Sequence, residues 1–278
     1  ADINRMKYLN YPRHHPQDFV DLEKAIEEFV LPGFTPDRPI IDEASIIRTQ
    51  GSCFARNLHE ALESSEFVSR YFHFPEAINS PIANRIFLDR VVGRKFMPSH
   101  KEHDHLFYEA LVSSLKELIP DESLFIFTVG VAGCWYDSEN KVPLINVDPA
   151  NLSGASFRWM TVDENRDHLN AIIHNLLQLN PDLHIVLTLS PVPINRAFGE
   201  MSAIAADCLS KSTLRVSIAE AINSAPKNVS YWPSFEIVRW LGSHLPPVFG
   251  TDDGISRHVS SDMVELIVRL FLRHYAKR

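Results

Sequence analysis

The sequence predicts an α/β fold in which helices cover both faces of a central parallel sheet. Three observations predict it: strand and helix patterns alternate along the chain, residues 123–131 (SLFIFTVGV) form a continuous apolar run, and no repeat or low-complexity tract divides the sequence. A continuous apolar strand is typical of a parallel sheet that is buried on both faces. In such sheets ligands bind beyond the carboxyl ends of the strands.

The first half of the chain supplies an N-terminal arm, two strands and three of the expected helices. A helix is expected at Asp18 to Phe29, and Leu31 to Arg38, with two prolines, reads as extended, so residues 1–43 are expected to wrap the body as an N-terminal arm. Ala44 to Gln50 is β-rich and ends at Gly51. The apolar stripe of the next helix falls at i, i+4, i+7 and i+8, which are Phe54, Leu58, Ala61 and Leu62. A helix at Leu106 to Leu118 then precedes the strand Ser123 to Val131.

The second half continues the alternation. Thr161 and Glu164 form a capping box for a helix that runs to about Leu179, where Pro181 stops it. The remaining elements are a strand at His184 to Leu189, a helix at Ala203 to Asn223, a strand at Val229 to Trp232, and a last helix that Ser260 or Ser261 caps. The buried stripe of the last helix is Val264, Ile267, Val268 and Phe271.

Composition limits the class of protein. The chain has 278 residues, 45% of them hydrophobic and 22% charged, which fits one globular domain over residues 1–278 without a membrane span. The 27 basic and 35 acidic side chains give a net charge of −8, which argues against nucleic acid and anionic membranes as general partners. The oligomeric state is not fixed by the sequence.

Cysteine usage and the first residues bear on location. Cys53, Cys134 and Cys208 are too few for a disulfide framework and lack the CxxC spacing of a zinc site. Residues 1–11 have no apolar core like that of a signal peptide. We therefore expect a reducing, cytoplasmic setting. The tract with His100, His103 and His105 is polar and reads as a solvated loop rather than as a metal site, so no metal is expected.

The turn Gly51-Ser52-Cys53-Phe54-Ala55 is the most informative segment. A turn of small residues between a buried strand and a helix places one side chain at the edge of the sheet, next to the first helical amides. A helix N-terminus stabilises a thiolate, and the amides can donate to an oxyanion. Cys53 is thus a candidate nucleophile; the alternative is that it is a small buried apolar residue, as many free cysteines are.

This turn resembles the motif that names the GSCFA domain family, and further segments are similar to that family in the same order. They are Trp135-Tyr136-Asp137 after Gly130, Leu189-Ser190-Pro191-Val192-Pro193, Ser210-Lys211-Ser212-Thr213-Leu214-Arg215, and Tyr231-Trp232-Pro233-Ser234-Phe235-Glu236-Ile237-Val238. The family is related to the SGNH/GDSL hydrolases, which are esterases and acyltransferases. The resemblance, which covers about residues 30–265, implies a three-layer α/β/α, flavodoxin-like fold of the SGNH type.

The resemblance also implies roles for the residues of the turn and of the C-terminal loop. The hydrolase nucleophile is third in a Gly-Asp-Ser turn, which puts Cys53 at its position and makes Ser52 a turn-bracing hydroxyl and the alternative nucleophile. His258 stands where the hydrolases have their general base. The aspartate expected three residues earlier is replaced by Ile255, so either the loop brings Asp253 to the ring or the site is a Cys/His dyad.

Oxyanion and substrate contacts are less complete. The family's Gly-x-Asn-Asp block reads Gly130-Val131-Ala132-Gly133 here, so Ala132 replaces the asparagine, and backbone amides or the side chain of Asn79 are the substitutes. Ser190, at a strand end, is a candidate contact. Trp135 could stack on a sugar ring or fill the core. Lys211 and Arg215 share a helix face that suits an anionic group or is simply solvated.

These residues together predict an esterase or O-acyltransferase that works through a Cys53 thioester with His258 as base. The expected substrate is a small polar or carbohydrate-type molecule; no cofactor is required, and acyl-CoA is one possible acyl donor. Two alternatives remain: a non-catalytic binding or scaffold protein, because of Ala132 and Ile255, and a serine esterase that uses Ser52.

Overall fold

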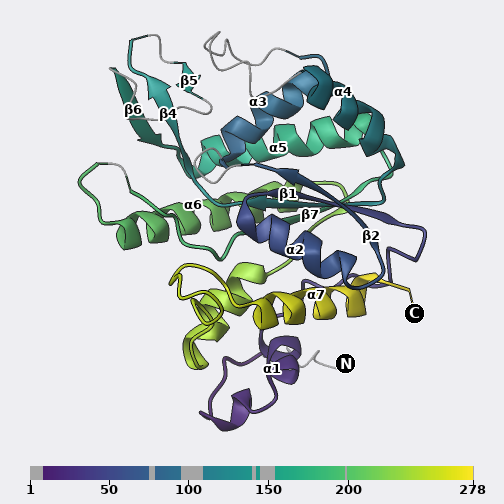
Figure 1. Ribbon diagram of the computed structural model, residues 1–278, viewed down its shortest axis with the longest axis vertical. Coiled ribbons are helices and arrows are strands. Elements are labelled where there is room, and N and C mark those ends of the chain that lie inside the picture. Colours follow the sequence, from purple (N-terminus) through teal and green to yellow (C-terminus); the bar gives the residue numbers. More distant parts are fainter. Residues whose placement is uncertain are drawn as a thin grey trace, which may run out of the picture.

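A five-stranded parallel sheet with strand order β2-β1-β3-β7-β8 forms the centre of the computed structural model (Figure 1). The structure describes residues 9–74, 79–94, 109–139, 142–144, 154–197 and 199–277. The strands of the sheet are β1 (Ile46–Gly51), β2 (Val68–His73), β3 (Leu124–Val129), β7 (His184–Leu189) and β8 (Val229–Tyr231). Numbered within this sheet alone, the order is the 2-1-3-4-5 of flavodoxin-like folds.

Helices cover both faces of the sheet (Figure 1). One layer contains α3 (Pro81–Val91), α4 (Glu109–Leu118), α5 (Val162–Leu179) and α6 (Ala203–Ser224). The other contains α1 (Leu22–Phe29), α2 (Cys53–Glu63) and α7 (Ser261–Tyr275). Short helical turns lie at Gln17–Phe19, Ile119–Asp121, Glu236–Trp240 and Leu241–His244. The predicted three-layer α/β/α fold with a central parallel sheet is therefore confirmed.

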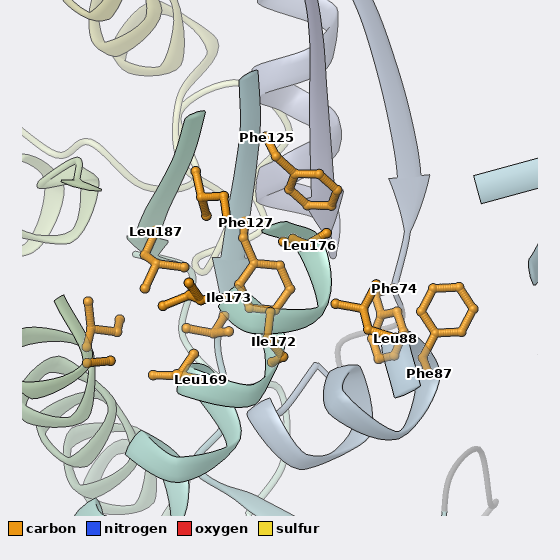
Figure 2. Close-up of a cluster of buried hydrophobic side chains, with 14 of the residues drawn as sticks. Phe74, Phe87, Leu88, Phe125, Phe127, Leu169, Ile172, Ile173, Leu176 and Leu187 are labelled. Atoms are coloured by element: carbon orange, nitrogen blue, oxygen red, sulfur yellow. The ribbon is translucent and has the colours of Figure 1, made fainter. Parts of the chain in front are cut away.

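Strand β3 shows why an apolar run lies at the centre of the sheet. All its residues are buried, and they alternate between the two layers. Phe125 and Phe127 pack against the α5 layer, where Figure 2 shows their rings beside Ile172 and Leu176. Leu124 and Ile126 belong to the core on the α2 and α7 side. Each such side chain contributes about 1.5–3 kcal/mol on burial, so β3 ties the layers together.

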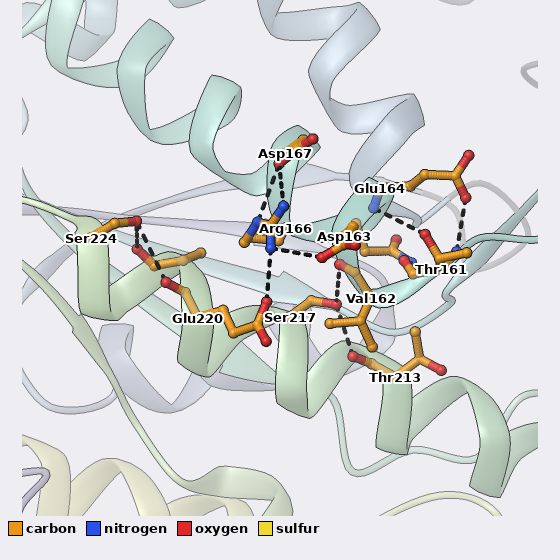
Figure 3. Close-up of polar contacts among 12 residues, drawn as sticks. Thr161, Val162, Asp163, Glu164, Arg166, Asp167, Thr213, Ser217, Glu220 and Ser224 are labelled. Carbon is orange, nitrogen blue, oxygen red and sulfur yellow. Dashed lines mark hydrogen bonds and ion pairs between the residues drawn. The ribbon is translucent and has the colours of Figure 1, made fainter.

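The predicted capping box at the start of α5 is confirmed. Thr161 Oγ1 accepts from the amide of Glu164 at 3.2 Å, and Glu164 Oε2 accepts from the amide of Thr161 at 2.9 Å (Figure 3). Ser217 Oγ of α6 donates to the Val162 carbonyl at 3.0 Å, and Arg166 pairs with Glu220 at 3.1 Å. These contacts fix α6 against α5 and so determine where the α6 side chains lie.

Several elements differ from the sequence pattern. The pattern does not predict β2, α3 or a three-stranded antiparallel sheet made of β4 (Gly133–Asp137), β5 (Pro143–Leu144) and β6 (Ala155–Trp159). Edge strand β2 has no buried residue, and α3 is buried on nearly all sides, so neither shows a clear apolar period. The helix expected from Asp18 begins at Leu22, because the Asp21 carboxylate caps it by accepting from the Lys24 amide.

The N-terminal region lies against the last helix. Glu23 and Glu27 of α1 pair with basic side chains of α7, and the amides of Ile40 and Ile41 both donate to the Tyr275 carbonyl. Ser260 caps α7, as predicted, and the four stripe residues expected in α7 are buried. None of the described helices has the length and apolar character that a membrane crossing requires.

Candidate functional site

The turn after β1 is tightly constrained. Gly51 has φ +149°, and a Cβ there would lie 2.9 Å from both Cβ and the carbonyl oxygen of Thr128 in β3. Only glycine fits both the conformation and the space. The chain then enters α2 with Ser52 as N-cap residue and Cys53 as the first helical residue. The turn therefore holds the Cys53 thiol, which is partly exposed, beside the unpaired first-turn amides of α2.

Tyr71 of β2 fixes the same turn from the side, which sequence reasoning did not find. Its hydroxyl donates to the carbonyls of Gly51 at 3.2 Å and Ser52 at 3.3 Å. The Nδ1 of His73 lies within hydrogen-bond distance of that hydroxyl, at 2.6 Å. Burial raises the pKa of Tyr71 to about 12 and, with the nearby Arg56 charge second, lowers that of His73. Side chains alternate along a strand, so a prediction of β2 would have placed Tyr71 and His73 on the same face of it.

His258 and Asp253 meet in the loop before α7. The carboxylate Oδ2 of Asp253 lies 2.6 Å from Nδ1 of His258, and Oδ1 accepts from the Ile255 amide at 2.9 Å. Gly254, at φ +75°, lets the loop fold back, so Asp253 supplies the acid that position 255 lacks. The hydrogen bond from His258 is the main reason that the pKa of Asp253 is lowered. Of the two arrangements left open by the sequence, the loop adopts the one with the acid on the ring.

Cys53, His258 and Asp253 line one open cavity of about 390 Å³. Its other walls come from α2, from the start of α7 and from Val192 in the loop after β7. Most of the lining residues are charged or polar, and they include Arg56, Asn57, Glu60, Ser64, Asp252 and Glu265, while Ala61, Val192, Val259 and Val264 add apolar surface. We call this space the thiol cavity. The Cys53 thiol comes from the N-terminal part of the sequence and the His258 imidazole from the C-terminal part, and both line this cavity.

A second, much smaller cavity is lined by Ser52, the residue before Cys53. It has a volume of about 10 Å³ and shares Val192 with the thiol cavity. Its polar wall consists of Ser52, Asn79, Gly130, Ser190 and Lys211, and its apolar wall of Val131, Val192 and Ile194. We call it the lysine cavity. Loops after β1, β3 and β7 form it, so it lies at the carboxyl edge of the sheet.

Three expectations for this edge need correction. Ser52 does not brace the turn, because its side chain makes no capping bond in α2. The amides of Gly130 and Val131 both donate to the Asn79 carbonyl at 3.2 Å, so they are not free for an oxyanion. The Ala132 amide donates to Ser210 Oγ at 2.9 Å inside the core, and Ala132 is 1% exposed. Of the oxyanion donors that the sequence suggests in place of the missing asparagine, the Asn79 side chain lines the lysine cavity.

Two other candidates lie elsewhere. Trp135 belongs to β4, where its ring packs on Phe157 at 5.6 Å, and it lines neither cavity. Arg215 pairs with Glu236 and lies over the Tyr231 ring, in a different cavity beneath residues 33–40. Lys211, on the same helix, lies in the lysine cavity, so the two cations do not act at one place.

Within the part of the chain that the structure describes, no group of three or more His, Cys, Asp or Glu side chains is arranged to hold a metal ion. The tract with His100, His103 and His105 lies outside the described residues. Cys134 is buried, and burial raises the pKa of its thiol to about 12.

Comparison with known proteins agrees with the motifs of the sequence. The model of the GSCFA family matches residues 46–271. The chain belongs to the GSCFA family. Its naming motif is the turn of Gly51 to Ala55, and the matched region also contains the His258 loop. No curated protein matches the sequence.

Solved structures resemble this GSCFA chain in fold. A carbohydrate esterase family 2 enzyme from Corynascus thermopiles (Myceliophthora fergusii) is 12% identical, with TM-score 0.47, over 86% of this chain and 67% of its own. A putative GDSL-like lipase from Parabacteroides merdae is 12% identical, with TM-score 0.44, over 85% of this chain and 98% of its own. An acetyl-xylooligosaccharide esterase variant from Geobacillus Stearmophilus is 11% identical, with TM-score 0.43, over 84% and 95%. These likenesses say nothing about the substrate of the GSCFA chain.

Proposed function

We propose that this protein is an acyl-transfer enzyme, an esterase or O-acyltransferase, that forms a thioester on Cys53 with His258 as general base. The observation that carries the proposal is the shared thiol cavity, in which a helix-terminal thiol and an acid-bound imidazole face one space. Since Nδ1 of His258 bonds to Asp253, Nε2 is the nitrogen left to exchange protons.

The reaction has two steps. In the first, Nε2 of His258 takes the thiol proton, and Sγ of Cys53 adds to the carbonyl carbon of the acyl donor. The donor's carbon–oxygen or carbon–sulfur bond breaks, and the leaving group takes the proton from His258. In the second, a water or hydroxyl oxygen attacks the thioester while His258 takes its proton. The sulfur–carbon bond breaks, and His258 returns the proton to the thiolate.

Two features of the site support charge development in these steps. The first-turn amides of α2 adjoin Cys53, and a helix N-terminus favours both a thiolate and an oxyanion. Asp253, with its lowered pKa, is a carboxylate at neutral pH and stabilises the imidazolium that forms. The site thus has a nucleophile, a base and a group that orients the base.

The thiol cavity bears on the substrate. Its walls hold amide, hydroxyl and charged groups, which suit a polar or carbohydrate-type acceptor better than an acyl chain alone. An acyl-CoA thioester and a simple ester both contain the carbonyl that the reaction needs, and no cofactor enters it. A thiol nucleophile must stay reduced, which is the basis for proposing a cytoplasmic location.

Covalent labelling tests the proposal. The whole chain is treated with iodoacetamide or with 4-nitrophenyl acetate, and the modified peptide is identified by mass spectrometry. We expect an alkyl or acetyl group on Cys53, loss of both in Cys53→Ala, and retention in Ser52→Ala. Cys208→Ala is the matched control, because Cys208 is exposed on α6 and belongs to neither cavity. A chain that alkylates at Cys53 but never acylates would favour the scaffold alternative.

A second candidate, the serine esterase, has one specific observation in its favour. The Ser52 hydroxyl makes no capping bond, and Ser52 lines the same small cavity as Lys211. A serine next to an amine is a known nucleophile and base arrangement. Ester turnover that survives Cys53→Ala and disappears in Ser52→Ala would select this alternative over the thioester mechanism.

A further inference from the structure

The lysine cavity has a shape and lining that the thioester mechanism alone does not explain. We infer that it is the binding site for the carbonyl oxygen of the acyl group, with the Lys211 ammonium as its positive charge. The inference rests on the proposed function, since it names the group that stabilises the oxyanion formed on attack by Cys53. The chemical class of ligand is an ester or thioester carbonyl.

The first support is the position of Lys211. Its side chain is 2% exposed, and Nζ donates to the Gly130 carbonyl at 2.8 Å. Asp207 lies one helical turn earlier, with Oδ1 3.9 Å from Nζ. That carboxylate also accepts from the Ile194 amide at 3.0 Å and pairs with Arg239 at 3.0 Å. A buried ammonium with this surrounding is fixed in place, as electrostatic stabilisation of a developing charge requires.

The second support is the geometry above Gly130. A Cβ built on Gly130 would lie 3.6 Å from Lys211 Nζ, 3.7 Å from Ser190 Cβ and 3.8 Å from Asn79 Nδ2. The space that glycine leaves is therefore bounded by an ammonium and an amide nitrogen. One N–H of that amide donates to the Thr128 carbonyl at 3.0 Å, and an amide has two.

The third support is size. The lysine cavity has about 10 Å³, close to the roughly 10–15 Å³ that one water needs. One oxygen atom fits, whereas a sugar or an acyl chain does not. Ser52, the residue before Cys53, lines the lysine cavity, and Val192 lines both cavities, so we infer that a carbonyl carbon on the sulfur directs its oxygen there. Charge on that oxygen is greatest in the tetrahedral intermediate, so a cation there favours the transition state over the bound ester.

The resemblance to the hydrolases also leaves the oxyanion donor of this chain unassigned. The asparagine that would donate to the oxyanion is replaced by Ala132, and the amides of Gly130 to Ala132 are already bonded within the protein. Lys211 and Asn79 supply donors from other segments to the same edge of the sheet.

Two variants test the inference. Gly130→Ala puts a methyl group into the cavity at ordinary contact distances, so the fold should survive while the oxygen is excluded. Lys211→Met removes the charge with a side chain of similar length. The acylation rate of Cys53 by 4-nitrophenyl acetate is measured for both by stopped flow and mass spectrometry. The rate of iodoacetamide labelling at high pH measures the reactivity of the Cys53 thiolate in a reaction that forms no oxyanion.

We expect the acylation rate of Cys53 to fall about 10²-fold in Lys211→Met and at least about 10-fold in Gly130→Ala. The alkylation rate of both variants should stay within a factor of about two of that of the unaltered chain. The exposed Lys227→Met is the control and should acylate normally. If Lys211→Met disturbs the buried Asp207, Gly130→Ala decides the outcome. Normal acylation in Gly130→Ala would overturn the inference alone. Absence of acylation in the unaltered chain would overturn the proposed function and the inference together.

Discussion

The imidazole of His258 and the carboxylate of Asp253 lie 2.6 Å apart, although Ile255 occupies the position at which the sequence resemblance leads us to expect the acid. A carboxylate only accepts, so Nδ1 of His258 holds the proton and Nε2 is unprotonated in the neutral ring. The second acceptor bond, from the Ile255 amide to Asp253 at 2.9 Å, fixes the loop that makes this pairing possible. The loop thus brings an acid to the ring from five residues away, where the resemblance implies one three residues away.

Asp253→Asn should reduce acyl transfer and leave the fold intact. The amide can offer its N–H to Nδ1, which selects the wrong tautomer of His258. Because a thiol is easier to deprotonate than a hydroxyl, we expect a loss of about 10–10²-fold in kcat rather than the roughly 10⁴-fold loss known for serine enzymes. Steady-state kinetics with 4-nitrophenyl acetate measure it. Asp262→Asn, on the exposed first turn of α7, is the control, and an equal loss there would contradict the role of Asp253.

Acid should weaken this loop before it unfolds the domain. The pKa of Asp253 is lowered in the folded chain by the bond from His258, and that of Asp252 is lowered because it accepts from the Ser261 amide at 2.7 Å. Stabilisation by a carboxylate of lowered pKa is complete above its unfolded pKa and is lost as the pH falls through the folded value. Hydrogen exchange at Ile255 and Ser261 should therefore rise below about pH 4. Unchanged protection at pH 3 would contradict this.

Gly51→Ala tests whether the turn geometry is as strict as the contacts indicate. Alanine at φ +149° is strained by about 1–3 kcal/mol, and its Cβ would meet Thr128 at 2.9 Å, which adds about 1–3 kcal/mol of overpacking. We expect a loss of about 2–5 kcal/mol in unfolding free energy, measured by urea denaturation. Gly130→Ala is the matched control, since its contacts begin at 3.6 Å. Equal stability of the two variants would refute the strict turn.

The sequence predicts the fold where burial follows a simple period. Leu124 to Val129 are apolar because both faces of β3 are covered, and the α7 stripe follows helical spacing because one face is covered. Strand β2 escapes this reasoning, since an edge strand with no fully buried residue has no apolar pattern. Local patterns report local burial, and they fail where burial is partial or complete on all sides.

The candidate site shows the same limit. Cys53 can be found because it follows the end of a predicted strand, and His258 because the family resemblance implies a base just before the last helix. Lys211 and Arg215 are four residues apart and suggest one solvated face, yet Lys211 is buried against Gly130 while Arg215 pairs with Glu236. That difference depends on how α6 packs on two distant loops. Asp253 likewise depends on a glycine-assisted loop that spacing alone does not reveal.

Removal of one charge from the buried ion pair between Arg48 and Glu122 should lower the free energy of unfolding. Arg48 of β1 and Glu122 before β3 form a bidentate pair with side chains 4% and 0% exposed, and Arg70 joins them at 3.2 Å. Glu122→Gln leaves the Arg48 charge without its partner, and we expect a loss of about 3–5 kcal/mol in denaturation experiments. The double variant Arg48→Met, Glu122→Leu should regain much of this loss, because both charges are gone. Additive losses would show that the pair is not coupled.

The attachment of α1 to α7 should depend on salt and pH. Glu23 accepts from Arg269 at 2.6 Å and pairs with Arg273, and Glu27 pairs with His274 at 2.8 Å, all near the surface. The bonds from Arg273 and Arg269 lower the pKa of Glu23, so its stabilising effect is present at neutral pH and is lost as the pH falls through the folded value. Exposed pairs are also screened by salt. Hydrogen exchange should therefore show α1 opening at pH 4 or in 1 M NaCl, while β3 stays protected.

Apolar contacts of the buried Ile26 oppose release of α1, so Ile26→Ala should make the opening easier under both conditions. If α1 stays protected in acid and salt, and loses protection only in Ile26→Ala, the apolar contact rather than the ion pairs holds the helix.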